Sequence, residues 1–154
     1  MPKGFETKIP PPMLAVLFIS FMWLADQYSP GSVIDETFRI SVAIGLSLFG
    51  ALSVVLGIVS FVRAKTTLNP LQPEKAGTLV TTGIYKYTRN PMYLGMLCVL
   101  LAWGLFLANG FSLVLAILFI PVMNFLQILP EERAMELNFR EHYIAYKGKV
   151  RRWL

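Results

Sequence analysis

Two adjacent carboxylates, Glu131 and Glu132, follow directly on a long apolar run and are the first side chains here that suggest chemistry. At helical spacing, Glu131 shares a mainly apolar face with Met135, Phe139, His142 and Tyr146. Glu132 falls on a wetter face with Glu136 and Arg140, with which it can pair. Because an acid on an apolar face is costly without a partner, we expect Glu131 to be the functional carboxylate. Glu132 is expected to contribute surface electrostatics or to support its neighbour.

A second polar group stands earlier in the chain, where Arg89 and Asn90-Pro91 precede another apolar run and Tyr93 lies one turn inside it. Asn90 is a favourable N-cap and Pro91 a favourable first helical residue, so helix initiation alone explains both. Arg89 is a permanent cation at the mouth of this run. It has two interpretations, because it can reach lipid phosphate or bind an anionic group in a site.

Other chemistries lack the residues they need. His142 is the single histidine, and no second histidine or thiolate completes a metal site, so we expect no metal. Cys98 lies in the middle of an apolar run, where a thiol stays protonated and inert. The sequence has no glycine loop with an adjacent lysine for nucleotide phosphates and no set of nucleophile, base and orienting group. A site here must use carboxylate, arginine and tyrosine side chains.

The elements that position these residues are expected to be membrane helices. Of the 154 residues, 55% are hydrophobic and 15% are charged, against about 25% charged in globular domains. One soluble core of this size cannot hide that much apolar surface. A bilayer crossing needs about 20 mostly apolar residues. We predict a single all-α domain over 1–154, a bundle of four transmembrane helices at about 13–28, 40–62, 91–108 and 111–129.

Local signals mark the helix boundaries. Three prolines, 10–12, suit the start of the first helix, and Asn109-Gly110 predicts a tight hairpin between the third and fourth. Pro121 should kink the fourth helix. Lysines precede the first run as in a secretory signal, but no small-residue cleavage site follows Leu24, so we expect that segment to remain as a span.

A stripe of small residues in the second span predicts close helix packing. The stripe consists of Ser47, Gly50, Gly57 and Ser60. The packing can occur within one chain or between two, so a homodimer is possible.

Charge asymmetry predicts the orientation of the bundle. The segment 63–91 and the tail 130–154 are rich in lysine and arginine, whereas the first connection holds mainly acids. The positive-inside rule therefore places both termini and both basic segments in the cytoplasm of a multi-pass cell-membrane protein. We expect a cytoplasmic amphipathic helix in 130–154, with its basic end, Lys147–Trp153, on anionic membrane lipids rather than on nucleic acid.

Several motifs of the chain, taken in their order and spacing, resemble those of one protein family. The motifs are Gly83-Ile84-Tyr85, then Arg89-Asn90-Pro91-Met92-Tyr93-Leu94-Gly95, then an apolar hairpin, then Glu131-Glu132 and Phe139, Tyr143, Tyr146 and Val150. The combination resembles the isoprenylcysteine carboxyl methyltransferase and phospholipid methyltransferase superfamily. The likeness runs from about Thr66 to Trp153, and the first two spans match only as apolar helices.

The resemblance implies an integral membrane enzyme that uses S-adenosylmethionine and releases S-adenosylhomocysteine. It implies that the cofactor is lined by Gly77, Thr78, Leu79, Val80, Tyr85, Asn90, Pro91, Met92 and Tyr93, and bound from the other side by Glu131. Arg89 would contact an anion or the substrate, so Arg89 and Glu131 are the expected catalytic residues. Aromatic faces such as those of Tyr85 and Tyr93 can stabilise a sulfonium cation by about 0.5–2 kcal/mol each.

Three positions depart from the family pattern. Many relatives have histidine where Asn90 stands, and a glycine commonly takes the place of Arg140 after the phenylalanine. In the eukaryotic prenylcysteine enzymes an arginine four residues before the first glutamate contacts the substrate, and Gln127 is the candidate substrate-binding residue there. This last departure weakens the case for a prenylcysteine carboxylate.

The sequence therefore predicts a methyltransferase for a lipidic or prenylated acceptor, similar to the isoprenylcysteine carboxyl methyltransferases. Alternatives on the same fold are methylation of a phospholipid amine or of a small thiol. A reductase-like relative that binds a nicotinamide cofactor, and a membrane scaffold without activity, also stay open.

Overall fold

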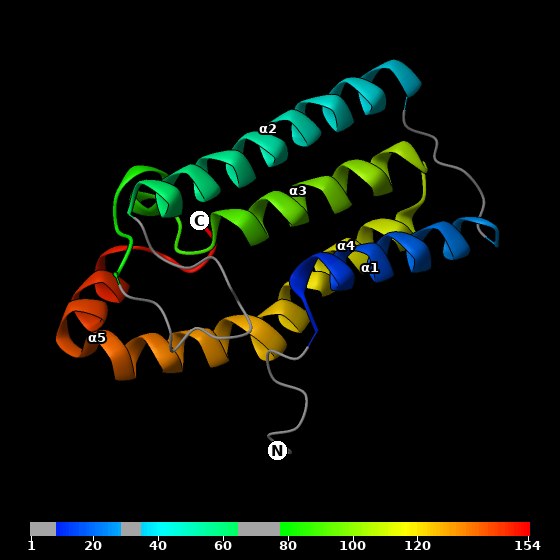
Figure 1. The fold of residues 1–154 in the computed structure, drawn as a ribbon. Helices are drawn as coiled ribbons and strands as arrows, with labels where there is room; N and C mark the ends of the chain where they lie inside the picture. Colours follow the sequence, from blue (N-terminus) through cyan, green and yellow to red (C-terminus); the bar gives the residue numbers. More distant parts are fainter. Residues whose placement is uncertain (1–8, 29–34, 65–77) are drawn as a thin grey trace.

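The computed structural model describes residues 9–28, 35–64 and 78–154, and these residues form helices joined by short connections. Five α-helices follow in chain order: α1 (Pro11–Asp26), α2 (Glu36–Arg63), α3 (Pro91–Phe106), α4 (Gly110–Met123) and α5 (Leu129–Lys149). A short 3-10 turn, η2 (Gly83–Lys86), precedes α3, and a π-helical turn, η3 (Asn124–Ile128), joins α4 to α5. The predicted all-α class is confirmed for the described residues, and α1 to α4 fall on the four predicted apolar runs (Figure 1).

The helices differ in how well they could cross a membrane. Two are long and apolar enough, α2 and the 40-residue run Gly110–Lys149 that contains α4, η3 and α5. The other two, α1 and α3, are apolar but have 16 residues each. That length rises about 24 Å, short of the ~30 Å of bilayer hydrocarbon. An apolar helical bundle is therefore observed, whereas four crossings remain a prediction.

The predicted helix boundaries follow from local chemistry. Pro10 and the prolines after it start α1, where a missing N–H group costs nothing. Asn109 closes the predicted hairpin, since its side-chain oxygen accepts hydrogen bonds from the backbone N–H groups of Phe111 and Ser112 at 2.9 and 3.2 Å. At the other boundary of this turn, Ala108 adopts a φ of 59°.

Two glycines let α2 approach α3 closely along the predicted small-residue stripe. A Cβ added to Gly50 would lie 2.7 Å from the Gly95 carbonyl oxygen, and one added to Gly95 would lie 2.5 Å from that of Gly50. Ser53 donates a hydrogen bond of 2.7 Å to the Pro91 carbonyl between the same helices. Because Gly57 also packs on α3, against Met92, the two glycines of the stripe serve contacts within one chain, whereas Ser47 is exposed.

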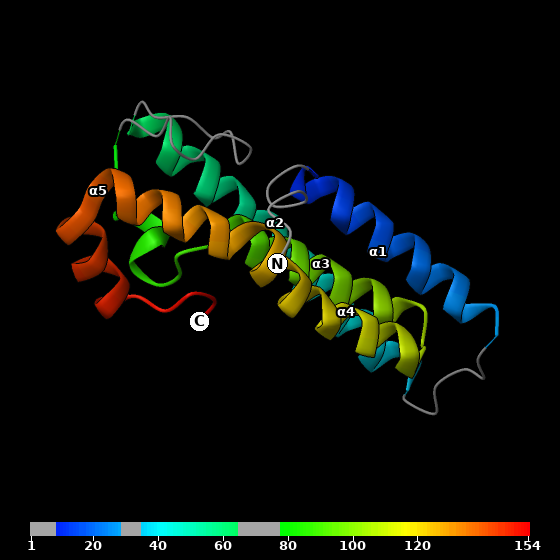
Figure 2. The ribbon, with the colours of Figure 1, turned by 90° about the horizontal axis from the view of Figure 1, so that it is seen from below.

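The helices alternate in direction, so the two segments that carry the candidate residues lie at one end of the bundle (Figure 1). η2 and the start of α3 lie beside α5 and the residues that follow it, as Figure 2 also shows. At the opposite end, Arg39 donates hydrogen bonds of 2.6 and 2.5 Å to the carbonyls of Leu105 and Phe106, which caps α3. The two ends of the bundle therefore differ: helix-capping contacts close one end, and the polar candidate residues lie at the other.

The passage from α4 to α5 is continuous but not regular. Pro121, the residue predicted to kink the fourth helix, lies inside α4, and the backbone departs from α-helical geometry in the next turn, at η3. The chain changes direction across this stretch (Figure 1). Turns of π-helix are frequent at functional sites.

A sharp break at Arg140 divides α5. Arg140 has φ 44° and ψ −120°, a conformation that suits glycine and strains other residues. Beyond it the helix turns back on its first half (Figure 2). The prediction of one continuous amphipathic helix with a stripe from Glu131 to Tyr146 is therefore wrong. After the break, Tyr143 and Tyr146 are buried while His142 is exposed.

The outer surface of the bundle is apolar. Large hydrophobic side chains project outward from three helices, and they include Phe21 of α1, Leu48 and Val55 of α2, and Ile117 of α4. Such a surface suits contact with lipid rather than with water.

Candidate functional site

Tyr93 and Glu131 meet at the polar end of the bundle. Tyr93 lies in the first turn of α3 and Glu131 in the first turn of α5, just beyond the apolar run that ends at Leu129. The Tyr93 hydroxyl donates a hydrogen bond of 2.5 Å to Oε1 of Glu131. Each of the two helices has a proline in its first turn, and this fixes where the two side chains emerge. Two polar segments far apart in the sequence therefore share one site.

Glu131 holds its proton unusually well. Burial raises its pKa from the usual 4.5 to about 7, the Tyr93 hydrogen bond opposes that rise, and the charge of Glu132 adds to it. Yet the side chain remains partly accessible. A carboxyl group with a strongly raised pKa is a candidate for a functional site.

Glu132 lies in a different environment, only 5% exposed and surrounded by cations. Its Oε1 accepts hydrogen bonds from Arg89 at 2.8 Å and from Nε of Arg152 at 2.9 Å, and its Oε2 accepts from Nη2 of Arg152 at 2.8 Å. Lys147 approaches Oε2 at 3.7 Å. Burial alone would raise the pKa of Glu132, but the hydrogen bond from Arg152 and the charges of Arg89, Arg152 and Lys147 outweigh it and lower the pKa.

This cluster corrects three predictions. The surface alternative for Glu132 is wrong, because Glu132 is the buried centre of an ion-pair network, whereas its support of Glu131 stays a prediction. Glu136 pairs with Lys147 at 2.7 Å, and Arg140 instead occupies the break in α5. The basic tail does not rest wholly on lipid, because Arg152 binds Glu132 and Trp153 packs against the apolar core. For Glu132 and for the basic tail, a partner distant in sequence decided the outcome.

Only part of the Arg89 guanidinium group has a hydrogen-bond partner among the described residues. Its Nη2 binds Glu132, and its side chain is 8% exposed. Its Nε and Nη1 atoms are buried and have no hydrogen-bond partner among the described residues. Buried guanidinium N–H groups are costly to leave unpaired, so this edge of Arg89 can receive an anionic or carbonyl oxygen.

Tyr85 and Tyr146 connect η2 to the second half of α5. Tyr85 is buried, and its ring lies 5.5 Å from that of Phe61 in an edge-to-face arrangement. Its backbone carbonyl accepts a hydrogen bond of 2.7 Å from the Tyr146 hydroxyl. Burial raises the pKa of Tyr85, and the neighbouring Tyr146 and Glu131 raise it further, so Tyr85 stays neutral at physiological pH.

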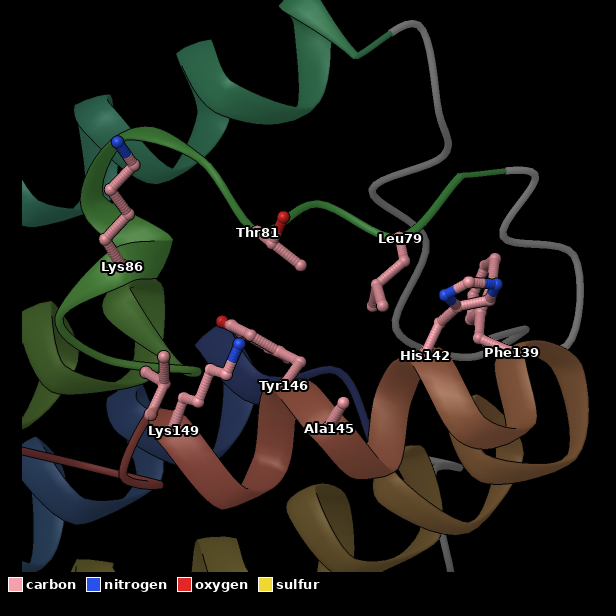
Figure 3. A pocket seen from close by; sticks show the side chains of 9 residues that line it. Leu79, Thr81, Lys86, Phe139, His142, Ala145, Tyr146 and Lys149 are labelled. Atoms are coloured by element: carbon pink, nitrogen blue, oxygen red, sulfur yellow. The ribbon is translucent and has the colours of Figure 1, made fainter.

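A cleft of about 730 Å³, a usual size for a small-molecule site, has Tyr146 in its lining. Arg89, Tyr93 and Glu131 are not among the residues that line it, nor is Tyr85. Figure 3 shows an extended stretch that carries Leu79 and Thr81 facing the second half of α5. The lining combines apolar and basic side chains: Leu79, Thr81, Lys86, Phe139, His142, Ala145, Tyr146, Lys149 and Val150. Tyr146 belongs to both the cleft and the Tyr85 contact.

The remaining predicted residues have varied positions. Leu79 lines the cleft, whereas Val80 is buried and Thr78 is exposed, and neither is among the cleft residues. Gly77 lies outside the described residues. Pro91 and Met92 pack against α2, both near Gly57. 

Asn90 and Gln127 make structural contacts. Nδ2 of Asn90 donates a hydrogen bond of 3.0 Å to the Arg152 carbonyl. Gln127 is fully buried in η3, where its Nε2 donates a bond of 2.6 Å to the Ile9 carbonyl and its Oε1 has no partner among the described residues. Gln127 therefore ties the start of α1 to η3 rather than presenting a charge to a substrate.

Sequence reasoning missed Arg152 and the role of Tyr146. Arg152 sits among other basic residues, and nothing in the local pattern distinguishes it from Arg151. Tyr146 was expected on the Glu131 stripe, and its burial depends on the break at Arg140. Among the described residues, no group of three or more His, Cys, Asp or Glu side chains could hold a metal ion.

Comparisons with known proteins give a consistent result. Residues 38–142 match the family model described as phospholipid methyltransferase. The chain is 49% identical over 63 residues to an uncharacterized protein of Haemophilus influenzae, which covers 41% of this chain and 100% of that protein. It is 36% identical over 77 residues to the protein-S-isoprenylcysteine O-methyltransferase of Saccharomyces cerevisiae. That second match covers 50% of this chain but only 32% of the yeast protein.

Proposed function

The chain belongs to the phospholipid methyltransferase family, and on this premise we propose that it transfers a methyl group from S-adenosylmethionine to a lipidic acceptor. One observation carries the proposal. The Tyr93 hydroxyl is hydrogen-bonded to Glu131 at the polar end of the bundle, and Tyr85 lies close enough to Glu131 for the two to interact electrostatically.

The residues present suit the donor. S-adenosylmethionine carries a cationic sulfonium, which a carboxylate such as Glu131 attracts and which aromatic faces stabilise by about 0.5–2 kcal/mol each. Apolar cleft residues such as Leu79 and Phe139 suit its adenine, and the lysines of the cleft suit its carboxylate. The unpaired edge of Arg89 offers a further anion contact.

The donor supplies a methyl group that is already activated for in-line displacement. The chain's own residues therefore need mainly to hold two reactants in line and to exclude water. The buried tyrosines Tyr85 and Tyr93 provide the dry wall of such a site. Glu131 and Arg89 are the proposed catalytic residues, because Glu131 is partly accessible and Arg89 has two buried N–H atoms without a partner among the described residues.

We propose an acceptor dissolved in the membrane, lipid or prenylated. A carboxylate or thiolate acceptor needs no base, whereas an amine must first lose a proton. Glu131, with a pKa of about 7, is suited to accept that proton, and this favours a phospholipid amine as the second candidate. Gln127, with its amide bonded to Ile9, supplies no cation for a prenylcysteine carboxylate.

The proposed setting is a multi-pass cell-membrane protein with the site on the cytoplasmic side. The polar end of the bundle carries Arg63, Lys86, Arg89 and the basic residues of α5, so the positive-inside rule favours this orientation.

Incubation of the purified protein with labelled S-adenosylmethionine and a total membrane lipid extract tests the proposal. We expect a labelled lipid with the wild type and with Glu141→Gln, an exposed acid on the same helix, but not with Glu131→Gln. Calorimetry with S-adenosylmethionine and with a reduced nicotinamide completes the test. Binding of the nicotinamide alone would indicate a reductase, and binding of neither would indicate a scaffold.

A further inference from the structure

The residues that follow α5 cross back over the start of α3. The backbone N–H of Arg89 donates a hydrogen bond of 3.0 Å to the Arg151 carbonyl. The Arg152 carbonyl accepts hydrogen bonds from Asn90 at 3.0 Å and from the Thr88 hydroxyl at 3.4 Å. Figure 1 shows this red segment ending beside the green start of α3. The crossing therefore fixes the turn that immediately precedes Tyr93.

The same residues also hold α5 and η3. The guanidinium of Arg152 binds both carboxylate oxygens of Glu132, an arrangement that fixes orientation as well as distance. The Trp153 ring packs against the apolar core, and its Nε1 donates a hydrogen bond of 3.1 Å to Asn124 in η3. The side chains of Arg152 and Trp153 thus hold α5 and η3, while the carbonyls of Arg151 and Arg152 hold the start of α3, which is far away in the sequence.

We propose that Arg152 and Trp153, with the carbonyls of Arg151 and Arg152, form a strap that sets the approach of Tyr93 to Glu131. Within the proposed function, on which this inference rests, Arg152 and Trp153 are positioning residues for the donor site. Tyr93 stands one helical turn beyond Asn90, and Glu131 precedes Glu132. A strap that holds Asn90 and Glu132 therefore determines where both site residues lie.

The charge of Arg152 should affect the pH at which Glu131 ionises, an effect that packing alone would not have. Glu131 is faced by Tyr93 from α3, Tyr85 from η2 and its own neighbour Glu132, beyond which stand Arg89, Arg152 and Lys147. The negative charge of Glu132 disfavours ionisation of Glu131. Removing Arg152 would leave that charge less balanced, so Glu131 would ionise at higher pH.

The test compares Arg152→Gln with Arg151→Gln in the full-length protein in detergent. The Arg151 side chain is exposed, carries the same charge and lies next to Arg152, so it is a matched control. We expect Arg152→Gln to weaken S-adenosylmethionine binding about tenfold, as for loss of a charge-assisted contact. The rise of S-adenosylmethionine affinity with pH should also occur at a higher pH in Arg152→Gln than in the wild type. Arg151→Gln should bind as the wild type does.

Two milder variants keep the test decisive if Arg152→Gln does not fold. Arg152→Lys keeps the charge but loses the two-point grip on Glu132, and Trp153→Phe keeps the ring but loses the bond to Asn124. We expect both to fold and both to bind the donor less tightly than the wild type, with Arg152→Lys retaining the wild-type pH dependence. Wild-type affinity in both would overturn the strap, as would equal losses in Arg151→Gln and Arg152→Gln, which would indicate lipid contact.

Hydrogen exchange separates failure of the strap from failure of the proposed function. If the wild type does not bind S-adenosylmethionine, the proposed function is wrong, and the strap is judged by the backbone amides of Arg89, Asn90, Met92 and Tyr93. We expect these amides to exchange faster in Arg152→Gln than in Arg151→Gln. Equal exchange in the two variants would refute the strap whatever the protein binds.

Discussion

Glu131 and Glu132 are neighbours in sequence but lie in opposite environments. Glu131 is partly accessible, hydrogen-bonded to the neutral Tyr93 hydroxyl, and has a pKa raised to about 7. Glu132 is sealed between Arg89 and Arg152 and has a lowered pKa. Successive residues of a helix point about 100° apart, so adjacent acids face different parts of the protein. One carboxylate is held by cations, and the other is held only by a neutral hydroxyl and is the proposed ligand for the donor.

The two carboxylates also have opposite effects on the stability of the fold. An ion-paired carboxylate contributes to folding, whereas a carboxyl group kept from water without a cation detracts from it once it is ionised. Sites that bind cations commonly accept such a cost. The two glutamates therefore predict opposite effects of mutation, and this is how the comparison can be tested.

The largest expected effect comes from breaking the buried network. Glu132→Ala should destabilise the protein by about 3–5 kcal/mol, because it leaves the buried charge of Arg89 without its partner. Thermal unfolding in detergent measures this change. Glu141→Ala, an exposed control, should stay within about 0.5 kcal/mol of the wild type. Equal stability of the two variants would mean that the network contributes nothing.

Glu131→Gln should leave the fold intact and weaken binding of the methyl donor. We expect S-adenosylmethionine affinity to fall by about 1.5–3 kcal/mol, the usual range for a hydrogen bond to a charged group. The unfolding midpoint at pH 8 should not fall, because the glutamine carbonyl can still accept from Tyr93 and no charge is buried. Calorimetry and thermal unfolding on one preparation check both parts. Loss of stability without loss of affinity would reverse the roles assigned to the two acids.

The pH dependences should also run in opposite directions. The pKa of Glu131 is raised from 4.5 to about 7, so its contribution to stability is complete below pH 4.5 and lost as the pH rises through 7. The pKa of Glu132 is lowered, so its contribution is present above pH 4.5 and lost as the pH falls.

Donor affinity should follow Glu131. It should fall about tenfold per pH unit below 7 and level off above, because only the ionised carboxylate attracts a cation. Titration calorimetry from pH 5.5 to 8.5 tests this expectation. A flat profile would show that Glu131 ionisation does not control binding.

The smallest expected effect concerns the break that brings Lys147 to Glu132. Arg140→Gly should stabilise the protein by roughly 1 kcal/mol, since glycine adopts the φ of 44° without strain. Donor affinity should not change, because Arg140 is exposed and is not among the cleft residues. A lower unfolding midpoint would mean that the arginine side chain contributes more than its backbone costs.

Local features of the sequence predict the helices and half of the candidate site. Long uncharged runs, prolines at helix starts and Asn109-Gly110 act locally, so the helices and the hairpin could be predicted from them. The motif from Arg89 to Tyr93 and the acid at 131 could be identified in the same way, because helix ends place polar residues at the boundary of an apolar run.

Long-range packing settles which glutamate is buried, which arginine is held and where α5 breaks. Those outcomes depend on partners far along the chain: Arg152 for Glu132, Tyr85 for Tyr146, and Asn124 for Trp153. A buried charge is stable only where opposite charges compensate it, and a strained backbone persists only where its surroundings impose it. Neither condition can be read from neighbouring residues, because both are properties of the packed whole.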